Sequence, residues 1–191
     1  VDAREKTLGY GEYVDDMEVE GLLHASAVRS KYPRARVLSI DTEKAKAVPG
    51  IVDIFTAADI PGDVKVGHLV QDWDTMIPVG SITHYLGDAI ALVVGENLDV
   101  VEKAKKLVKV EYEELPFVSS PYEAMKEDAP QVHGSGNLLA HKHVSRGNAK
   151  EAIANAKYVY TEEFHTPWTE HAFLEPECAI AMPYEDGVLI Y

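Results

Sequence analysis

The alternation of apolar and polar residues predicts a series of strands in the first half of the chain. Residues 22–29 place small or apolar side chains at alternate positions, which is typical of a strand with one buried face. Two more strands are expected, over residues 37–42 and 51–55. Residues 89–94 are all apolar, a pattern that indicates a strand buried on both faces.

Short helices are expected between these strands. Thr42 is a candidate N-cap for a helix over residues 43–48, which Pro49-Gly50 would end. Asn97 is a candidate N-cap for a second helix, in which apolar residues recur at helical spacing and lysines lie on the other side. The apolar stripe consists of Val100, Val101, Ala104, Leu107 and Val108.

The predicted elements twice have the order strand, helix, strand. The first such unit covers residues 35–55, and the second covers residues 88–113 and ends in a strand over residues 110–112. Residues 62–82 are expected to be loop with short extended pieces. The predicted fold class is therefore α+β, assembled from α/β units.

Proline and glycine mark a change of organisation after residue 116. The next twenty residues have no sustained period except a short helical piece expected over residues 122–126, and they are typical of a connector. Beyond it we expect strands over 141–144 and 158–164, a helix over 149–155, and a hairpin from strands 179–182 and 187–191. The predicted regions are a first domain over 1–116, a connector over 117–137, and the start of a second domain over 138–191.

The composition of the chain limits the classes of binding partner and the cellular compartments that are expected. The 191 residues carry a net charge of −14, which argues against a nucleic-acid or anionic-membrane partner because both need a basic face. No apolar run is long enough to span a bilayer, and the chain does not start with a signal-peptide pattern. The single cysteine excludes an internal disulfide and a Cys-based metal site from this chain alone. A cytoplasmic location is expected.

The densest group of chemically able side chains lies in residues 164–178. His171 and Glu175 stand four apart, a spacing that could bind Zn²⁺ on one helical face, with His165 nearby. Pro167 and Pro176 leave little room for such a helix. A metal-dependent hydrolase site and a pair of hydrogen-bonded structural residues both remain open as interpretations.

Other candidates carry less chemistry. His133, His141 and His143 form a loose group, with the last two on one face of an expected strand, and surface histidines explain them best. Cys178 has no basic neighbour in sequence, which favours a buried structural thiol. Neither a phosphate-binding GxxxxGK or GxGxxG loop nor a GxSxG nucleophile elbow occurs.

Several motifs resemble one family. The stretches 21–30, 35–41, 48–52, 56–61, 87–94 and 110–116 are together similar to the a/b hammerhead domain of molybdenum hydroxylases, the xanthine dehydrogenase and aldehyde oxidase family. Residues 147–181, with the run Glu170-His171-Ala172-Phe173-Leu174-Glu175-Pro176, resemble the opening of that family's molybdopterin-binding region. The resemblance covers nearly the whole chain.

This resemblance implies oxidative hydroxylation of a purine-like heterocycle, with water as the oxygen source. It implies molybdopterin with molybdenum, iron–sulfur clusters and FAD on other domains or subunits, and an oligomeric full-length enzyme. The family's catalytic base lies further along the large subunit. We therefore expect no catalytic residue in this chain, and no activity from these 191 residues alone.

One position next to the metal should be present. In many relatives a Gln before the Glu-His pair hydrogen-bonds an oxo ligand of molybdenum, and here Thr169 takes that place before Glu170 and His171. The shorter Thr side chain has one hydroxyl, so its reach differs from that of an amide. The run 167–177 is more similar to a selenium-dependent branch of xanthine dehydrogenases, which adds selenium to the implied cofactors.

Other functions stay open beside the xanthine dehydrogenase-like one. The chain could belong to an aldehyde oxidase-type or other heterocycle dehydrogenase subunit, taking an aldehyde or another N-heterocycle. It could also be a non-catalytic hammerhead scaffold whose acidic surface docks iron–sulfur and flavin partners.

Overall fold

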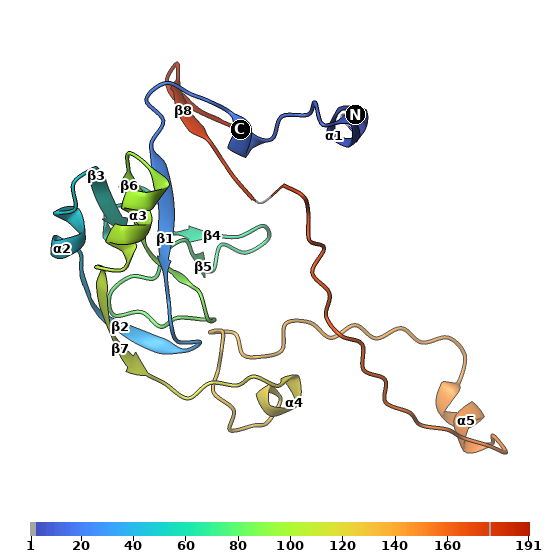
Figure 1. Ribbon diagram of the computed structural model, residues 1–191. Coiled ribbons are helices and arrows are strands. Elements are labelled where there is room, and N and C mark those ends of the chain that lie inside the picture. Colours follow the sequence, from blue (N-terminus) through green and yellow to red (C-terminus); the bar gives the residue numbers. More distant parts are fainter. Residues whose placement is uncertain (1–2, 176) are drawn as a thin grey trace. The chain divides into compact units, whose positions relative to one another are not determined.

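The computed structural model describes residues 3–175 and 177–191. The chain divides into two units, and Figure 1 labels their helices and strands. One unit is Gly21–His141, and the other combines the residues up to Glu20 with Lys142–Tyr191. No helix in the described residues is long and apolar enough to cross a membrane.

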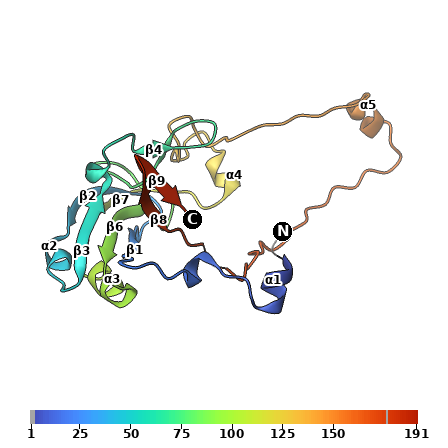
Figure 2. The same cartoon turned by 90° about the horizontal axis from the view of Figure 1, so that it is seen from above.

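The Gly21–His141 unit is organised around a three-stranded antiparallel sheet in the order β1-β6-β3. Its strands are β1 (His24–Arg29), β6 (Ala89–Gly95) and β3 (Ile51–Thr56), which lie side by side in Figure 2. The all-apolar strand β6 is central, and its residues Ile90, Ala91 and Val93 are fully buried. The prediction of a strand buried on both faces is confirmed.

A second antiparallel pair joins β2 (Ala35–Asp41) to β7 (Lys109–Glu114). The two strands of each predicted strand–helix–strand unit therefore belong to different sheets. Parallel pairing within a unit needs a crossover of a dozen or more residues, and the link over residues 42–50 is shorter. The expected element order is right, but the strands pair between the units and not within them.

Helix α3 (Leu98–Lys105) packs on β1 and β6. The Asn97 side chain accepts a hydrogen bond of 3.0 Å from the backbone N–H of Val100, which confirms the predicted N-cap. Val101 and Ala104, from the predicted apolar stripe, are fully buried. They belong to a first core cluster of Ala45, Val48, Ile54, Ala91, Val93, Val101 and Ala104.

A second core cluster lies against the other face of β6. It contains Val37, Ile77 and Ile90, with Val110 and Tyr112 packed against it. Successive residues of a strand point to opposite faces, so Ile90 enters this cluster while Ala91 enters the first. Strand β6 thus separates two cores.

The remaining elements of the Gly21–His141 unit are short. The stretch 62–82 is mostly loop, with one small pair of strands, as expected. These elements are α2 (Glu43–Lys46), the 3-10 turn η2 (Ala57–Asp59), β4 (Lys65–Val66), β5 (Trp73–Asp74) and α4 (Pro121–Ala124).

The other unit contains little regular structure. The predicted terminal hairpin is present, with a turn at Glu185, whose φ of 49° is left-handed. The strands expected over 141–144 and 158–164 are wrong, because no partner strand pairs with them among the described residues. The elements of this unit are α1 (Ala3–Leu8), η1 (Val14–Asp16), α5 (Ala149–Ala154), β8 (Ala181–Tyr184) and β9 (Gly187–Ile190).

The burial of β6 predicts how its side chains contribute to stability. Replacing Val93 by Ala removes two buried methyl groups and should lower the free energy of unfolding by about 2–3 kcal/mol. The same change at Val52 in β3, which is 55% exposed, should cost less than about 1 kcal/mol. Urea unfolding followed by circular dichroism measures both, and equal losses would contradict the packing of β6.

Candidate functional site

The candidate site is an extended segment, residues 157–179, in the orange-to-red part of Figure 1. Among its described residues no backbone–backbone hydrogen bond forms. Its largest apolar side chains are mostly exposed, namely those of Phe164, Trp168, Phe173 and Leu174. Monomeric proteins rarely expose so many large apolar side chains together, and such surfaces mark binding sites.

Thr169, Glu170 and His171 are consecutive and exposed. The Glu170 carboxylate accepts a 3.0 Å hydrogen bond from the backbone N–H of His171, and the His171 ring stacks on Phe173 at 5.6 Å between centroids. Ala172, which lies between His171 and Phe173 in the sequence, has a left-handed φ of 51°. The Thr169 hydroxyl makes no hydrogen bond within the part of the chain that the structure describes, so it is available to a ligand.

Glu175 is held by the N-terminal part of the same unit. Its Oε1 accepts a 3.1 Å hydrogen bond from the backbone N–H of Val14, and its Oε2 lies 3.6 Å from Lys6 Nζ. Lys6 Nζ lies 4.5 Å from the centre of the Tyr13 ring. Glu175 is therefore a hydrogen-bonded structural residue, one of the two interpretations left open by the sequence.

A hollow of about 450 Å³ lies beside this contact. Its lining residues are Tyr13, Phe173, Leu174, Glu175, Glu177 and Cys178. Cys178 is exposed, so the prediction of a buried structural thiol is wrong. The thiol lies in the extended segment, where no neighbouring element of the described chain covers it.

The three residues considered for zinc do not converge. His165 Nε2 lies 3.3 Å from the Glu163 carboxylate, His171 stacks on Phe173, and Glu175 contacts Lys6. Across residues 3–175 and 177–191, no three His, Cys, Asp or Glu side chains come together as metal ligands. The zinc interpretation therefore has no geometric support in the described residues.

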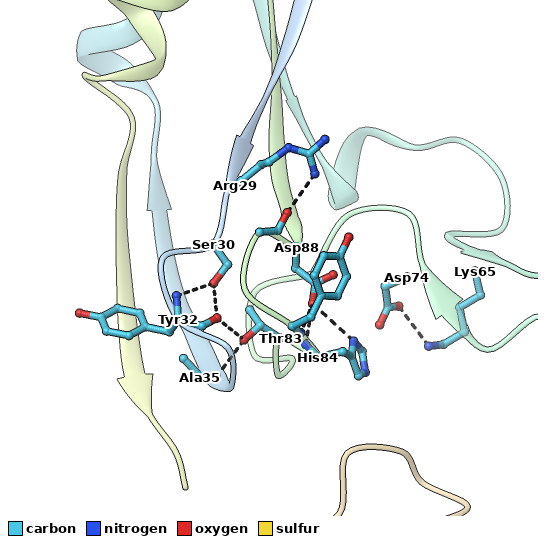
Figure 3. A network of polar contacts seen from close by, with 11 residues as sticks. Arg29, Ser30, Tyr32, Ala35, Lys65, Asp74, Thr83, His84 and Asp88 are labelled. Atoms are coloured by element: carbon cyan, nitrogen blue, oxygen red, sulfur yellow. Dashed lines mark hydrogen bonds and ion pairs between the residues drawn. The ribbon is translucent and has the colours of Figure 1, made fainter. Parts of the chain in front are cut away.

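A second polar centre surrounds Asp88, just before β6 (Figure 3). This carboxylate is almost fully buried and accepts hydrogen bonds from the backbone N–H groups of His84 (2.5 Å) and Tyr85 (3.3 Å). His84 Nδ1 lies 3.7 Å from the same carboxylate, and it is buried without a hydrogen-bond partner among the described residues. Asp88 thus fixes the loop that leads into the central strand.

Neighbouring bonds connect this loop to the turn between β1 and β2. Arg29 donates a 2.9 Å bond to the carbonyl of Gly87, and the Ser30 hydroxyl donates to the Tyr32 carbonyl at 2.8 Å. The Thr83 hydroxyl accepts from the backbone N–H of Ala35 at 2.9 Å. Figure 3 shows these bonds together, and all of them are to backbone groups, which indicates a structural role.

Four rings gather next to Asp88. The Trp73 ring lies 5.2 Å from His84, 5.7 Å from Tyr85 and 6.0 Å from His133. His133 also lies 3.8 Å from the Asp72 carboxylate. The sequence grouped His133 with His141 and His143 instead, and the strand expected for those two does not form.

Sequence reasoning missed the contacts of Asp88, His84 and Lys6. An acidic residue directly before an all-apolar strand was a usable signal for Asp88, because a carboxylate that is buried there needs hydrogen-bond donors. Nothing local indicated that Lys6 meets a residue far along the chain.

Comparison with known proteins defines the family. The description "Aldehyde oxidase and xanthine dehydrogenase, a/b hammerhead domain" matches residues 8–116, and "Molybdopterin cofactor-binding domain" matches residues 132–191. The chain belongs to the aldehyde oxidase and xanthine dehydrogenase family, as its hammerhead domain followed by the start of the cofactor-binding domain.

Individual relatives agree with this assignment. The chain is 33% identical over 186 residues to a probable xanthine dehydrogenase subunit of Bacillus subtilis, covering 97% of this chain and 25% of that protein. It is 34% identical over 197 residues to a xanthine dehydrogenase molybdenum-binding subunit of Escherichia coli, covering 98% of this chain and 26% of that protein. The chain thus spans about a quarter of the length of these two curated relatives.

Solved structures have the same fold. Quinoline 2-oxidoreductase from Pseudomonas putida 86 superposes with a TM-score of 0.67 at 27% identity, over 82% of this chain and 21% of that one. Aldehyde oxidoreductase from Desulfovibrio gigas superposes with a TM-score of 0.65 at 29% identity, over 70% of this chain and 16% of that one.

The geometry around Asp88 predicts a stability effect. Asp88→Ala leaves the part-buried N–H groups of His84 and Tyr85 without their acceptor and should lower the free energy of unfolding by about 1–3 kcal/mol. Asp88→Asn keeps one acceptor oxygen and should cost less. The exposed Asp128 supplies the control, for which Asp128→Ala should change little. If Asp88→Ala unfolds at the same urea concentration as the wild type, the capping role is wrong.

Proposed function

We propose that the whole protein is a molybdenum-containing oxidoreductase that hydroxylates a purine-like N-heterocycle, with water as the oxygen source. The observation that carries this proposal is the match of nearly the whole chain to two xanthine dehydrogenase subunits at 33–34% identity. The two family descriptions, matched in order along the chain, support it.

A heterocyclic substrate is favoured by the names of the relatives. They include a nicotinate dehydrogenase subunit, 31% identical over 99% of this chain, and quinoline 2-oxidoreductase among the solved structures. An aldehyde is the second candidate, because an aldehyde oxidoreductase of Megalodesulfovibrio gigas is 30% identical over 95% of this chain.

The described residues suit a polar, oxygen-rich cofactor. The Thr169 hydroxyl is free of hydrogen bonds among the described residues, and the backbone N–H groups around it form no backbone–backbone hydrogen bond, although that of His171 donates to the Glu170 carboxylate. Such donors favour oxo and phosphate oxygens. When bound, molybdopterin with molybdenum would supply the redox chemistry.

Each residue of the Thr169–His171 run has a proposed task. Thr169 would donate its hydroxyl hydrogen to an oxygen on the metal, at the position where many relatives have Gln. Glu170 supports this residue by accepting the His171 N–H, which fixes the backbone next to Thr169. His171 is supported in turn by its stacking on Phe173. We assign no catalytic base to this chain.

The exposed apolar side chains of residues 157–179 point to a covering partner. We propose that further parts of the same large subunit pack on them, because the two xanthine dehydrogenase subunits are about four times as long as this chain. The three regions 1–116, 117–137 and 138–191 then serve as hammerhead domain, connector and first wall of the cofactor site.

The proposal extends to partners of the whole protein. Iron–sulfur clusters and FAD on other domains or subunits would take the electrons, in an oligomeric cytoplasmic enzyme. Selenium is proposed as a further component on the likeness of residues 167–177 to the selenium-dependent branch.

A scaffold role is a second candidate for the Gly21–His141 unit. This unit has its own two core clusters and does not need residues 157–179 to complete them. It could then dock electron-transfer partners without taking part in the chemistry.

The role of Thr169 is testable in the whole enzyme. Thr169→Val keeps the shape of the side chain but removes its hydroxyl, so the kcat for xanthine should fall by about tenfold or more. Thr166→Val, in the same extended segment, is the matched control and should stay near the wild-type value. Thr169→Gln should retain activity, because an amide also donates a hydrogen bond.

Elemental analysis together with activity assays tests the molybdenum dependence, the role of Thr169 and the substrate class separately. Molybdenum should be stoichiometric in the whole enzyme and absent from the 191-residue chain alone. An active enzyme without molybdenum would refute the proposed function. Full activity of Thr169→Val in a molybdenum-loaded enzyme would refute only the role of Thr169. Turnover of benzaldehyde but not of xanthine would show that the substrate is an aldehyde.

A further inference from the structure

A hollow of about 470 Å³ opens in the Gly21–His141 unit, between the end of β1, the last turn of α3 and β7. Its volume lies in the range of small-molecule sites. Val28 and Val108 line it and also pack on the first core cluster, while Val110 packs on the second. The hollow is therefore rooted in both cores of the unit and is not a gap between loose loops.

The charge of the lining is opposite to that of the chain. Arg29, Lys31, Lys105 and Lys106 line the hollow, and Glu102 is its one acidic residue. Four cations and one carboxylate leave a formal charge of +3, on a chain whose net charge is −14. Local concentration of one sign of charge in a concave site attracts ligands of the other sign.

Only one of these cations is neutralised by a close partner among the described residues. Lys105 Nζ lies 2.6 Å from Glu102 Oε1 and 2.8 Å from the Ser26 hydroxyl, and this Lys105 hydrogen bond is the main cause of the lowered pKa of Glu102. Arg29 donates to the uncharged carbonyl of Gly87. Lys31 and Lys106 make no hydrogen bond or ion pair among residues 3–175 and 177–191.

Two aromatic rings complete the lining. Tyr32 and Tyr112 meet edge to face, with their centroids 5.2 Å apart. Partial burial raises the pKa of Tyr112, although a hydrogen bond with the Ser30 side chain acts in the opposite direction. Aromatic rings of this kind bind a further ring by stacked or edge contacts.

We propose that this hollow binds a small aromatic phosphate monoester. Lys31 and Lys106 supply point charges for phosphate oxygens, and Arg29 adds a third positive charge to the lining. A formal charge of +3 complements a phosphate dianion better than a single carboxylate. The two tyrosines and the three valines would contact the aromatic part. The site is independent of the molybdenum chemistry, since none of its residues lies in segment 157–179.

Calorimetric titration of the full 191-residue chain tests the site with three probes. Phenyl phosphate carries both features, inorganic phosphate carries only the charge, and phenol carries only the ring. Phenyl phosphate should bind at least about tenfold more tightly than either of the others, and its affinity should fall as salt is added. Absence of phenyl phosphate binding up to about 10 mM, the range of a weak site, or equal affinity for inorganic phosphate, would overturn the proposal.

Variants locate the binding in the hollow. Lys106→Gln and Arg29→Gln should each weaken phenyl phosphate binding by about fivefold or more, whereas Lys103→Gln, on the same helix but outside the lining, should leave it unchanged. Glu102→Gln should tighten binding, because it removes the negative charge beside Lys105. Urea midpoints check that each variant is folded. Wild-type affinity in the folded Lys106→Gln variant, or equal weakening by Lys103→Gln, would contradict the assignment.

Discussion

Burial of strand β6 on both faces is the constraint on which the Gly21–His141 unit depends. An all-apolar strand must be covered on each side, and the chain meets this need with two separate clusters. Helix α3 covers one face of β6, and residues of β2, β7 and the loop at Ile77 cover the other. The loop before β6 is held by the buried carboxylate of Asp88, which accepts hydrogen bonds from two backbone N–H groups of that loop. The basic hollow beside Tyr112 lies where the two covers meet.

The extended segment 157–179, unlike the Gly21–His141 unit, is not organised around a buried strand. It has no backbone pairing among its described residues, and it exposes several of its largest side chains, so its own sequence does not define a core. Within the described residues, Glu175 is its anchored position, through Val14 and Lys6 in the same unit. This contrast fits a division of tasks in which one unit is a stable scaffold and the other offers polar donors to a cofactor. The family descriptions agree with this division, because the hammerhead domain matches residues 8–116 and the cofactor-binding domain matches residues 132–191.

Local patterns predicted the parts of the fold that local physics controls. The Asn97 cap, the apolar stripe of α3 and the doubly buried β6 all depend on residues a few positions apart. Strand pairing could not be predicted in this way, because β2 and β7 are brought together by the cores and not by the turn between neighbouring strands. Residues 158–164 have a strand-like composition but no partner in the described chain, and composition alone cannot supply one. Thr169 was proposed as a cofactor contact from family resemblance and not from its spacing, and that role stays a prediction.

The most direct test of the cofactor-site role is hydrogen–deuterium exchange on the whole enzyme, with and without bound molybdopterin. The amides of β6 should be strongly and equally protected in both states, because two cores bury the strand. Residues 164–175 should exchange rapidly without the cofactor and become protected when it binds. Equal protection of residues 164–175 in both states would contradict the claim that this segment forms a wall of the cofactor site.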